Sequence, residues 1–215
     1  MQKLEDSLLI FNKLSLSIGY RMTSLLRADC FDANFNGFSK DSVIFTTLMD
    51  MNIIDACSFL DEYHEYFGVT TEKTYLPKII EIKQICKPFI KQINKWKDLK
   101  KYRNTFSAHN LRNKKHENIY RSRIDHIAPR KIHEMELLCG CIQLITYIIK
   151  SEFEVEFVTA KQNINLDIPS YYSMTKDECY KIIDSLIQQA NLNLNSSGRD
   201  YTIKEIKTTV ANTRS

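Results

Sequence analysis

Apolar residues recur along most of this chain at steps of three and four, the period of an amphipathic α-helix. The first such stretch runs from Leu4 to about Asp29, with apolar positions at Leu8, Phe11, Leu14, Ile18, Met22 and Leu25. A second follows Ser39, a capping residue, and stops at Gly68, a common helix terminator. We therefore expect two long helices joined by a loop at residues 30–38.

Prolines delimit the next two helices. The third should begin near Tyr75–Pro77 and be kinked or split at Pro88, because proline lacks the N–H that a helix interior needs. Its apolar stripe continues to Phe106, and the polar and basic stretch at residues 110–118 should form a loop. A fourth helix is expected from about Arg130, directly after Pro129, to Phe153.

The C-terminal part of the chain has weaker signals. Residues 157–172 have no clear period. Thr175 and Glu178 form a capping signal for a fifth helix that ends near Asn191. Together, the patterns predict an all-α protein, an antiparallel bundle of four to five helices. We expect a single domain over residues 1–195 and a polar tail at residues 196–215.

Composition agrees with long helices and excludes several classes of protein. The 215 residues include only 5 Gly and 4 Pro, too few for a turn-rich β-fold. No secretory signal or run of eighteen apolar residues is visible, so we expect a cytoplasmic protein without a membrane span. No Gly-rich phosphate loop or serine nucleophile motif occurs, and we expect no cofactor.

The six cysteines lie mostly within apolar periodic stretches, which favours buried free thiols in a reducing compartment. Cys139-Gly-Cys141 could suggest a pair of metal ligands. Its spacing matches no zinc knuckle, however, and no second pair follows. We therefore expect no metal site.

The net charge of +4 conceals a strong asymmetry. Residues 95–131 contain 12 Lys and Arg against 3 Asp and Glu, a local charge of +9, while the rest of the chain carries −5. Such a concentration is typical of a surface that binds phosphate groups. A solvated helix face followed by a basic loop would give the same counts.

One motif within this basic segment suggests chemistry. The stretch KWKDLKKYRNTFSAHNLRNK (95–114) contains Arg103-Asn104 followed by His109, the pattern Arg-Asn-x4-His. An arginine can hold a phosphate and the added charge of a pentacoordinate transition state. A histidine can move a proton at neutral pH. These groups suit metal-independent cleavage of a phosphodiester.

Structural alternatives exist for each member of the motif. His109 can cap the carbonyls of its own helix, and Arg103 can pair with Asp98 or Glu134. A looser Arg-x4–6-His pattern is also met by Arg121 and His126, so only the stricter pattern is informative. Trp96 and Tyr102 could stack on bases, although their spacing in the apolar stripe favours the core.

The stretch KKYRNTFSAHN (100–110) resembles the signature of HEPN domains, helical modules of which the abortive-infection branch is the most similar. The preceding stretch LMDMNIIDACSFLDEY (48–63) resembles the second helix of that branch, whose acidic residue matches Asp55 best. The resemblance spans roughly residues 40–115. It implies a homodimer in which two Arg/His sets line one cleft, and a ribonuclease acting as a toxin or antiphage effector, often beside a cognate antitoxin protein.

The leading hypothesis is therefore an endoribonuclease that leaves 2′,3′-cyclic phosphate ends. His109 would transfer protons, Arg103 would stabilise the phosphate, and Asn104 would orient the pair. Further contacts to the RNA phosphates are expected from Lys100, Lys101, Arg112, Lys114, Lys115 and His116. The alternatives are a catalytically inactive HEPN-like module that binds RNA, nucleotide or a protein partner, and an unrelated regulatory bundle in which the motif is accidental.

Overall fold

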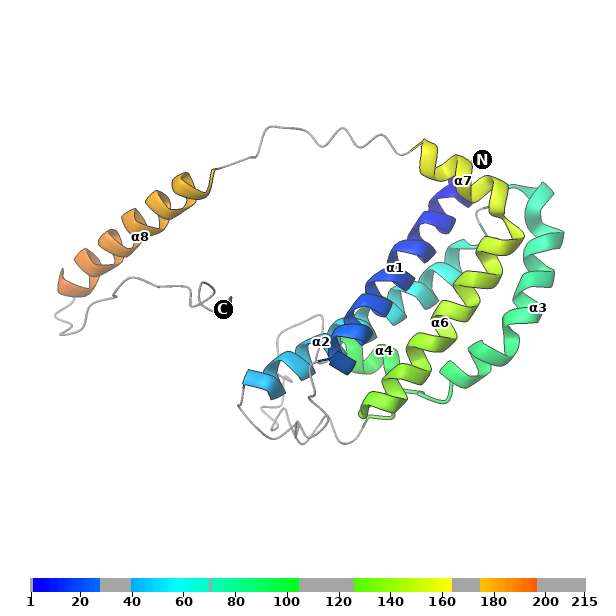
Figure 1. The fold of residues 1–215 in the computed structure, drawn as a ribbon, viewed down its shortest axis with the longest axis horizontal. Helices are drawn as coiled ribbons and strands as arrows, with labels where there is room; N and C mark the ends of the chain where they lie inside the picture. Colours follow the sequence, from blue (N-terminus) through cyan, green and yellow to red (C-terminus); the bar gives the residue numbers. More distant parts are fainter. Residues whose placement is uncertain (1, 28–39, 70, 105–125, 164–174, 197–215) are drawn as a thin grey trace. The chain divides into compact units, whose positions relative to one another are not determined.

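The computed structural model describes residues 2–27, 40–69, 71–104, 126–163 and 175–196 (Figure 1). Every regular element within these ranges is a helix, which confirms the all-α class for the described part of the chain. The chain divides into two units, residues 1–165 and 166–215. This boundary lies earlier in the chain than residue 195, where the sequence had suggested that a single domain would end.

The first unit is built around helix α1, which packs against three other long helices. A further helix, α3, packs against one of these three. These elements are α1 (Gln2–Arg27), α2 (Lys40–Asp61), α3 (Leu76–Ile93), α6 (Ile132–Glu152) and α7 (Glu154–Gln162). α1 contacts α2, α6 and α7, while α3 packs on α6 (Figure 1).

Polar contacts between the helices fix their directions. Lys150 donates a hydrogen bond to Asn12 at 3.1 Å, and Gly19 lies against the side chain of Gln143. Residue numbers rise along α1 as they fall along α6, so these two helices are antiparallel. α1 and α2 are antiparallel as well. Ser7 bonds to Glu62, directly after α2, whereas Arg21, further along α1, pairs with the earlier residue Asp55.

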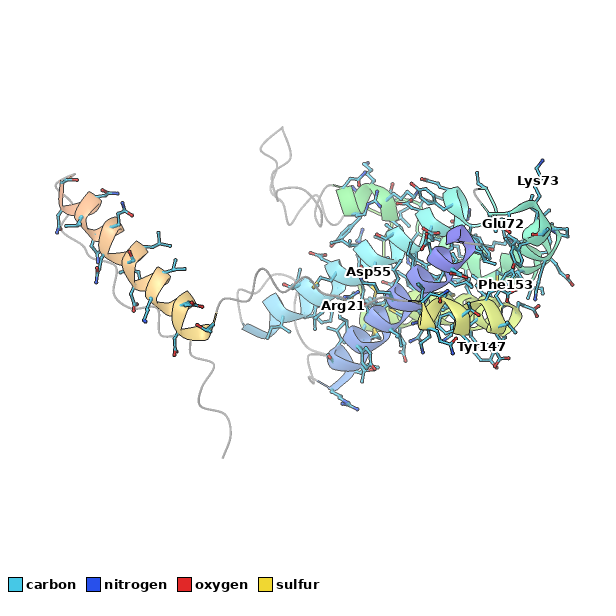
Figure 2. The ribbon with its side chains drawn as sticks, turned by 90° about the horizontal axis from the view of Figure 1, so that it is seen from above. Arg21, Asp55, Glu72, Lys73, Tyr147 and Phe153 are labelled. Atoms are coloured by element: carbon cyan, nitrogen blue, oxygen red, sulfur yellow. The ribbon has the colours of Figure 1, made fainter. Side chains whose placement is uncertain are left out.

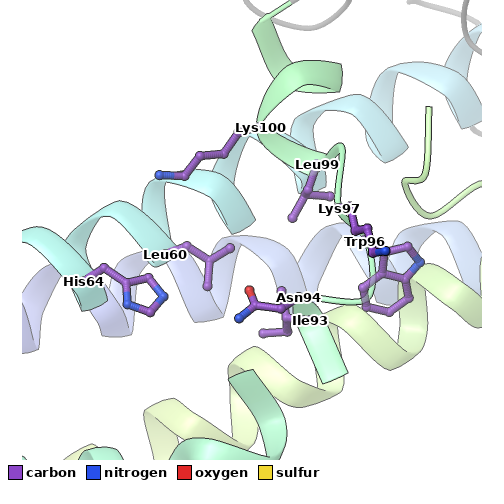
Figure 3. A pocket seen from close by; sticks show the side chains of 8 residues that line it. All are labelled: Leu60, His64, Ile93, Asn94, Trp96, Lys97, Leu99 and Lys100. Carbon is purple, nitrogen blue, oxygen red and sulfur yellow. The ribbon is translucent and has the colours of Figure 1, made fainter. Parts of the chain in front are cut away.

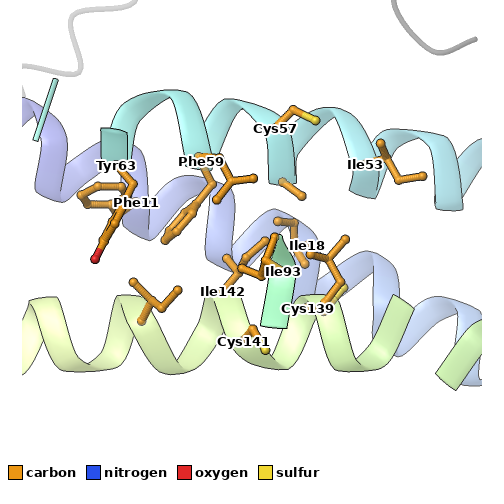
Figure 4. Close-up of a cluster of buried hydrophobic side chains, with 14 of the residues drawn as sticks. Phe11, Ile18, Ile53, Cys57, Phe59, Tyr63, Ile93, Cys139, Cys141 and Ile142 are labelled. Carbon is orange, nitrogen blue, oxygen red and sulfur yellow. The ribbon is translucent and has the colours of Figure 1, made fainter. Parts of the chain in front are cut away.

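The core lies where α1, α2 and α6 face one another, with the end of α3 inserted between them (Figure 4). Phe11 of α1 packs at 4.9 Å between ring centroids against Phe59 of α2, and both rings are fully buried. Complete burial of such a side chain contributes about 1.5–3 kcal/mol relative to exposure. The apolar stripe read from the sequence is thus the stripe that forms the core.

Buried thiols belong to this core as well. Cys57, Cys86, Cys139 and Cys141 are free and buried, as the sequence predicted for them. Burial raises the pKa of Cys57 and of Cys86 to about 11, so neither is a ready nucleophile. Among the described residues, no group of three or more His, Cys, Asp or Glu is arranged to hold a metal ion.

The second helix reaches Gly68 as predicted, but its last turns change type. α2 ends at Asp61, and a π-helix follows at Glu62–Tyr66, closed by the Phe67 N–H donating to the Glu62 carbonyl at 2.8 Å. Gly68 then takes a φ of +92°, which only glycine adopts without strain. π-Helical turns often mark functional sites, and sequence periodicity gives no sign of this one.

The third helix was predicted to kink or split at Pro88; it does not split there, and the chain leaves the helix only after Ile93. α3 runs through Pro88 to Ile93 and is followed by a connection at residues 94–98. A four-residue helix, α4 (Leu99–Tyr102), comes next. Asp98 explains the break, because its N–H donates to the Ile127 carbonyl at 3.1 Å and its carboxylate accepts the Ile127 N–H at 2.9 Å. This two-way bond pulls the chain out of the helical path.

The fourth predicted helix is α6, and its first turn is stabilised by Glu134. The carboxylate of Glu134 accepts the N–H groups of Arg130 and Lys131 at 2.8 and 3.1 Å. No clear period was visible in the sequence after Phe157, and the structure has a helix, α7, at Glu154–Gln162.

α6 is also long and apolar enough to cross a membrane by length and composition alone, with a mean hydropathy of 1.4 over eighteen residues. The sequence analysis expected no membrane span, because it looked for an unbroken run of apolar residues, and it did not identify this helix as a candidate. In the structure α6 packs against α1, α2 and α3 through its buried residues, among them Leu138, Ile142 and Ile145, whereas Leu137, Leu144 and Tyr147 are exposed. The core helix of a bundle meets the same criteria.

The second unit contains α8 (Lys176–Ser196). Thr175 and Glu178 cap it reciprocally, as predicted. The Thr175 N–H and hydroxyl donate to the Glu178 carboxylate at 2.7 and 2.8 Å, and the Glu178 N–H donates to the Thr175 hydroxyl oxygen at 3.3 Å. α8 extends beyond Asn191, where the sequence placed its end.

Candidate functional site

The short helix α4 fixes the first half of the Arg-Asn-x4-His motif. Its apolar residues Leu99 and Tyr102 are buried, and the Tyr102 hydroxyl donates a hydrogen bond to Asp50 of α2 at 2.9 Å. This packing confirms Tyr102 as a core residue. With those two positions anchored, Lys100 and Lys101 are exposed and Arg103 is half-buried at the end of the turn.

Asp61, the last residue of α2, is the carboxylate that meets this turn. It accepts a hydrogen bond from Nη1 of Arg103 at 2.9 Å, and Nζ of Lys100 lies 2.5 Å from its other oxygen. Burial alone would raise the pKa of Asp61, but the bonds and charges of Lys100 and Arg103 outweigh burial and hold the pKa below its usual value. One ionised carboxylate therefore joins two cations of the motif region.

The two cations differ in how firmly they are held. The side chain of Arg103 is 23% exposed and that of Lys100 is 51% exposed. Lys100 also approaches Glu65 at 3.8 Å, and its hydrogen bond to Asp61 raises the pKa of its ammonium group. Lys100 therefore stays protonated at neutral pH. The planar guanidinium of Arg103 is fixed in direction, whereas the ammonium remains accessible to a ligand.

Asn104 lies beside Arg103, as its proposed role requires. Its side-chain oxygen accepts a hydrogen bond from Nε of Arg103 at 3.1 Å. Nε and Nη1 of the guanidinium are thus oriented by an amide on one side and a carboxylate on the other. Arg103 pairs with Asp61, and no bond from it to Asp98 or Glu134 is seen, since Asp98 binds Ile127 and Glu134 caps α6.

The acidic residue proposed from the sequence, Asp55, lies elsewhere on α2. Its carboxylate is paired with Arg21 of α1, and the two side chains point toward each other (Figure 2). Nε of Arg21 also donates to the buried Asn52 at 2.8 Å. Asp55 therefore joins α1 to α2, and of these two carboxylates Asp61 is the one that bonds to Arg103. Both residues are acidic positions of one helix, and only the packing of α4 distinguishes them.

Several predicted site residues cannot be placed. His109, Arg112, Lys114, Lys115 and His116 lie outside the described residues. His126, the histidine of the looser pattern, is buried, and its ring packs edge-on against Tyr102 at 6.2 Å. The His126 side chain is therefore part of the packed interior.

A pocket of about 380 Å³ opens next to Asp61, where α3 ends between α2 and α4 (Figure 3). Leu60, Ile93 and Leu99 provide its apolar surface, and Trp96 stands at the opposite end from His64. Trp96 is partly buried against the core, as its spacing had favoured, and it also lines this pocket.

His64 is an exposed residue at the other end of this pocket. It belongs to the π-helix that follows Asp61 and lines the pocket with Lys97 and Lys100. Burial of its ring, and then the charges of Lys83 and Lys100, lower the pKa of His64 below its usual value. The imidazole is therefore neutral at pH 7 and has one acceptor and one donor nitrogen.

The chain matches no protein-family model, and neither the curated proteins nor the solved structures include a significant match to it. The site is therefore interpreted from its own chemistry.

Proposed function

We propose that this chain is a metal-independent endoribonuclease of the HEPN type, which acts as a toxin or antiphage effector in the cytoplasm. The observation that carries the proposal is the fixed guanidinium of Arg103. It ends a basic turn, and Asp61 and Asn104 orient it. Cleavage of RNA through its own hydroxyl group needs a fixed cation at the phosphate and a group that transfers protons, and no metal.

In this reaction the 2′-oxygen of a ribose attacks the adjacent phosphorus, and the bond from phosphorus to the 5′-oxygen breaks. The 2′-hydroxyl loses a proton and the 5′-oxygen gains one, which gives a 2′,3′-cyclic phosphate and a 5′-hydroxyl. We assign the proton transfers to His109, five residues after Asn104 in the motif. We assign to Arg103 the stabilisation of the charge on the pentacoordinate phosphate.

The remaining cations of the basic segment would hold the rest of the strand. Lys100 and Lys101 are exposed beside Arg103, which suits contacts to neighbouring phosphates. Arg112, Lys114, Lys115 and His116 belong to the same proposal on sequence grounds. A homodimer would bring two motifs to one cleft, because each chain contains a single Arg-Asn-x4-His sequence. A cognate antitoxin protein would be the natural partner of such an enzyme.

One observation favours a second candidate, a catalytically inactive module that binds RNA, nucleotide or a protein through the same surface. Asp61 already neutralises part of the charge of Arg103 and Lys100. A phosphate that binds there must compete with this carboxylate. Binding without cleavage would be the signature of this candidate.

The experiment is a cleavage assay on purified protein with single-stranded RNA in the presence of EDTA. We expect products with cyclic phosphate ends. We expect His109→Ala and Arg103→Ala each to lower the rate by roughly 10²- to 10⁴-fold, the range for positioned acid–base groups and oriented charges. Arg103→Lys should restore little, because an ammonium cannot replace the planar fork.

Arg121→Ala is the matched control, since Arg121 fits only the looser pattern. It should retain most of the activity. His126→Ala is not a suitable control, because it would remove a buried ring. If the parent protein binds RNA but does not cleave it, the ribonuclease proposal is rejected in favour of the catalytically inactive binding module.

A further inference from the structure

The pocket beside Asp61 is lined by groups outside the Arg-Asn-x4-His motif, and of these only Lys100 has a part in the proposed function. Its floor is apolar, and its one aromatic wall is Trp96. At about 380 Å³ it lies at the lower end of the range of small-molecule pockets. A flat ligand of modest size fits such a volume better than a peptide or a lipid chain.

The polar groups around the floor suit a nucleotide. The side-chain amide of Asn94 has two donor hydrogens and one acceptor oxygen, which match the edge of a base. Lys97 and Lys100 are exposed at the same pocket and provide positive charge for a phosphate. Stacking of a base on an aromatic ring contributes about 1–3 kcal/mol and requires a base that is unpaired.

His64 adds an uncharged imidazole that can form hydrogen bonds with the base. The charges of Lys83 on α3 and Lys100 on α4 act on its ring, as do those of Asp61 at the end of α2 and Glu65 in its own π-helix. Partial burial of the ring, and then the charges of the two lysines, lower the pKa of His64, so the imidazole is neutral at pH 7. A neutral imidazole can accept one hydrogen bond from a base and donate another.

The position of the pocket relative to Arg103 sets its role. Lys100 lines the pocket and also shares the carboxylate of Asp61 with Arg103. A phosphate attached to a nucleotide in the pocket would therefore lie between the two cations. We propose that the pocket binds one unpaired nucleotide of an RNA strand, next to the phosphate that Arg103 contacts. This inference rests on the proposed function for its choice of RNA, while nucleotide binding itself can be tested without cleavage.

The chain contains a single tryptophan, so the intrinsic fluorescence of Trp96 reports on this pocket alone. The probes are the four nucleoside monophosphates, a short 2′-O-methyl RNA that cannot be cleaved through its 2′-oxygen, and the same RNA in a duplex. Titrations at about 0.15 M salt limit non-specific attraction to the basic surface. We expect saturable quenching by the single strand and by at least one monophosphate, and none by the duplex.

Two neighbouring lysines give a matched pair of variants. Lys97 lines the pocket, whereas Lys95 is exposed in the same connection and bonds only to Gln92 at 2.7 Å among the contacts described. We expect Lys97→Ala and Asn94→Ala each to weaken the binding of the single strand by about tenfold, which corresponds to about 1.4 kcal/mol. Lys95→Ala should bind as the parent does. All three positions are exposed, so folding is preserved.

Each other outcome has a distinct meaning. Quenching by monophosphates alone would overturn the assignment to RNA and leave a pocket for a free nucleotide. Equal losses in Lys97→Ala and Lys95→Ala would show general attraction to charge and overturn the pocket. If no probe quenches the fluorescence, the pocket proposal is overturned as well. Cleavage of RNA in that case would leave the proposed ribonuclease function intact. Quenching by the strand without any cleavage would retain the pocket and remove the enzyme.

Discussion

Replacement of Asp61 by asparagine tests whether this carboxylate, rather than Asp55, organises the site. The substitution keeps the size of the side chain and one acceptor oxygen, but it removes the negative charge. Arg103 then loses a charged acceptor at 2.9 Å, and Lys100 loses its closest counter-charge. The two losses differ in size because the two cations differ in exposure.

The magnitude follows from these exposures. Arg103 and Asp61 are 23% and 26% exposed, so their bond belongs with partly buried hydrogen bonds to charged groups, which contribute about 1.5–3 kcal/mol. Lys100 is half-exposed, and solvent screening limits its pair to about 0–1 kcal/mol. Since asparagine retains part of the first bond, we expect Asp61→Asn to lower the free energy of unfolding by about 1–2 kcal/mol. For a protein of this size, the melting temperature should fall by about 2–8 °C.

Urea unfolding of the parent, Asp61→Asn, Arg103→Gln and the double variant measures the coupling between the two residues. The parent should lose its advantage over Asp61→Asn in acid. The pKa of Asp61 is lowered by folding, so the stabilisation is complete above the ordinary value of 3.8 and disappears as the pH falls through the lowered pKa. Additive effects of the two single variants, or a stability difference that persists unchanged in acid, would refute the reasoning.

Two further predictions concern the backbone and the assembly. Gly68→Ala should destabilise the protein by about 1–2 kcal/mol, because φ is +92° and the new methyl would meet Ile79 at 2.9 Å. Gly140→Ala, with nothing within 4 Å of the added carbon, should leave stability unchanged or raise it by up to about 1 kcal/mol; equal losses in both variants by thermal unfolding would contradict this account. The proposed composite cleft requires a homodimer, so light scattering should give twice the chain mass of 25.2 kDa, and a monomer at high concentration would exclude that cleft.

The helices of the first unit were predictable because burial imposes a period on the sequence. α1 and α6 lie within a few residues of the predicted bounds, and apolar residues at helical spacing make up most of their buried positions. α7 was missed because only Phe157 and Ala160 of its nine residues are buried, too few to show a period. The end of α3 at Ile93, where the sequence had predicted that the apolar stripe would continue, has a different cause. Asp98 binds Ile127, a long-range contact that a local pattern cannot reveal.

The candidate site, too, has features that local sequence predicts and features that depend on long-range packing. Arg103 and Asn104 were found because adjacent residue types carry the signal, and the structure places their side chains in contact. Asp61 and Asp55 lie on one helix, so the choice between them depends on how α2 meets α1 and α4. The pocket was not predictable, because Leu60, Ile93 and Leu99 come from three elements and meet only after the connection at residues 94–98 turns away from α3.

The two-way bond between Asp98 and Ile127 has a consequence for how this protein can change over evolution. The bond brings together two points of the chain, and the covalent path between them contains the whole Arg-Asn-x4-His sequence. The entropy of closing such a path grows only with the logarithm of its length, so a doubling adds about 0.6 kcal/mol. A change in the length of this path would therefore add little to the entropy cost of closing it. The bond between Asp98 and Ile127 can thus hold the two ends of the path together while the number of residues between them varies.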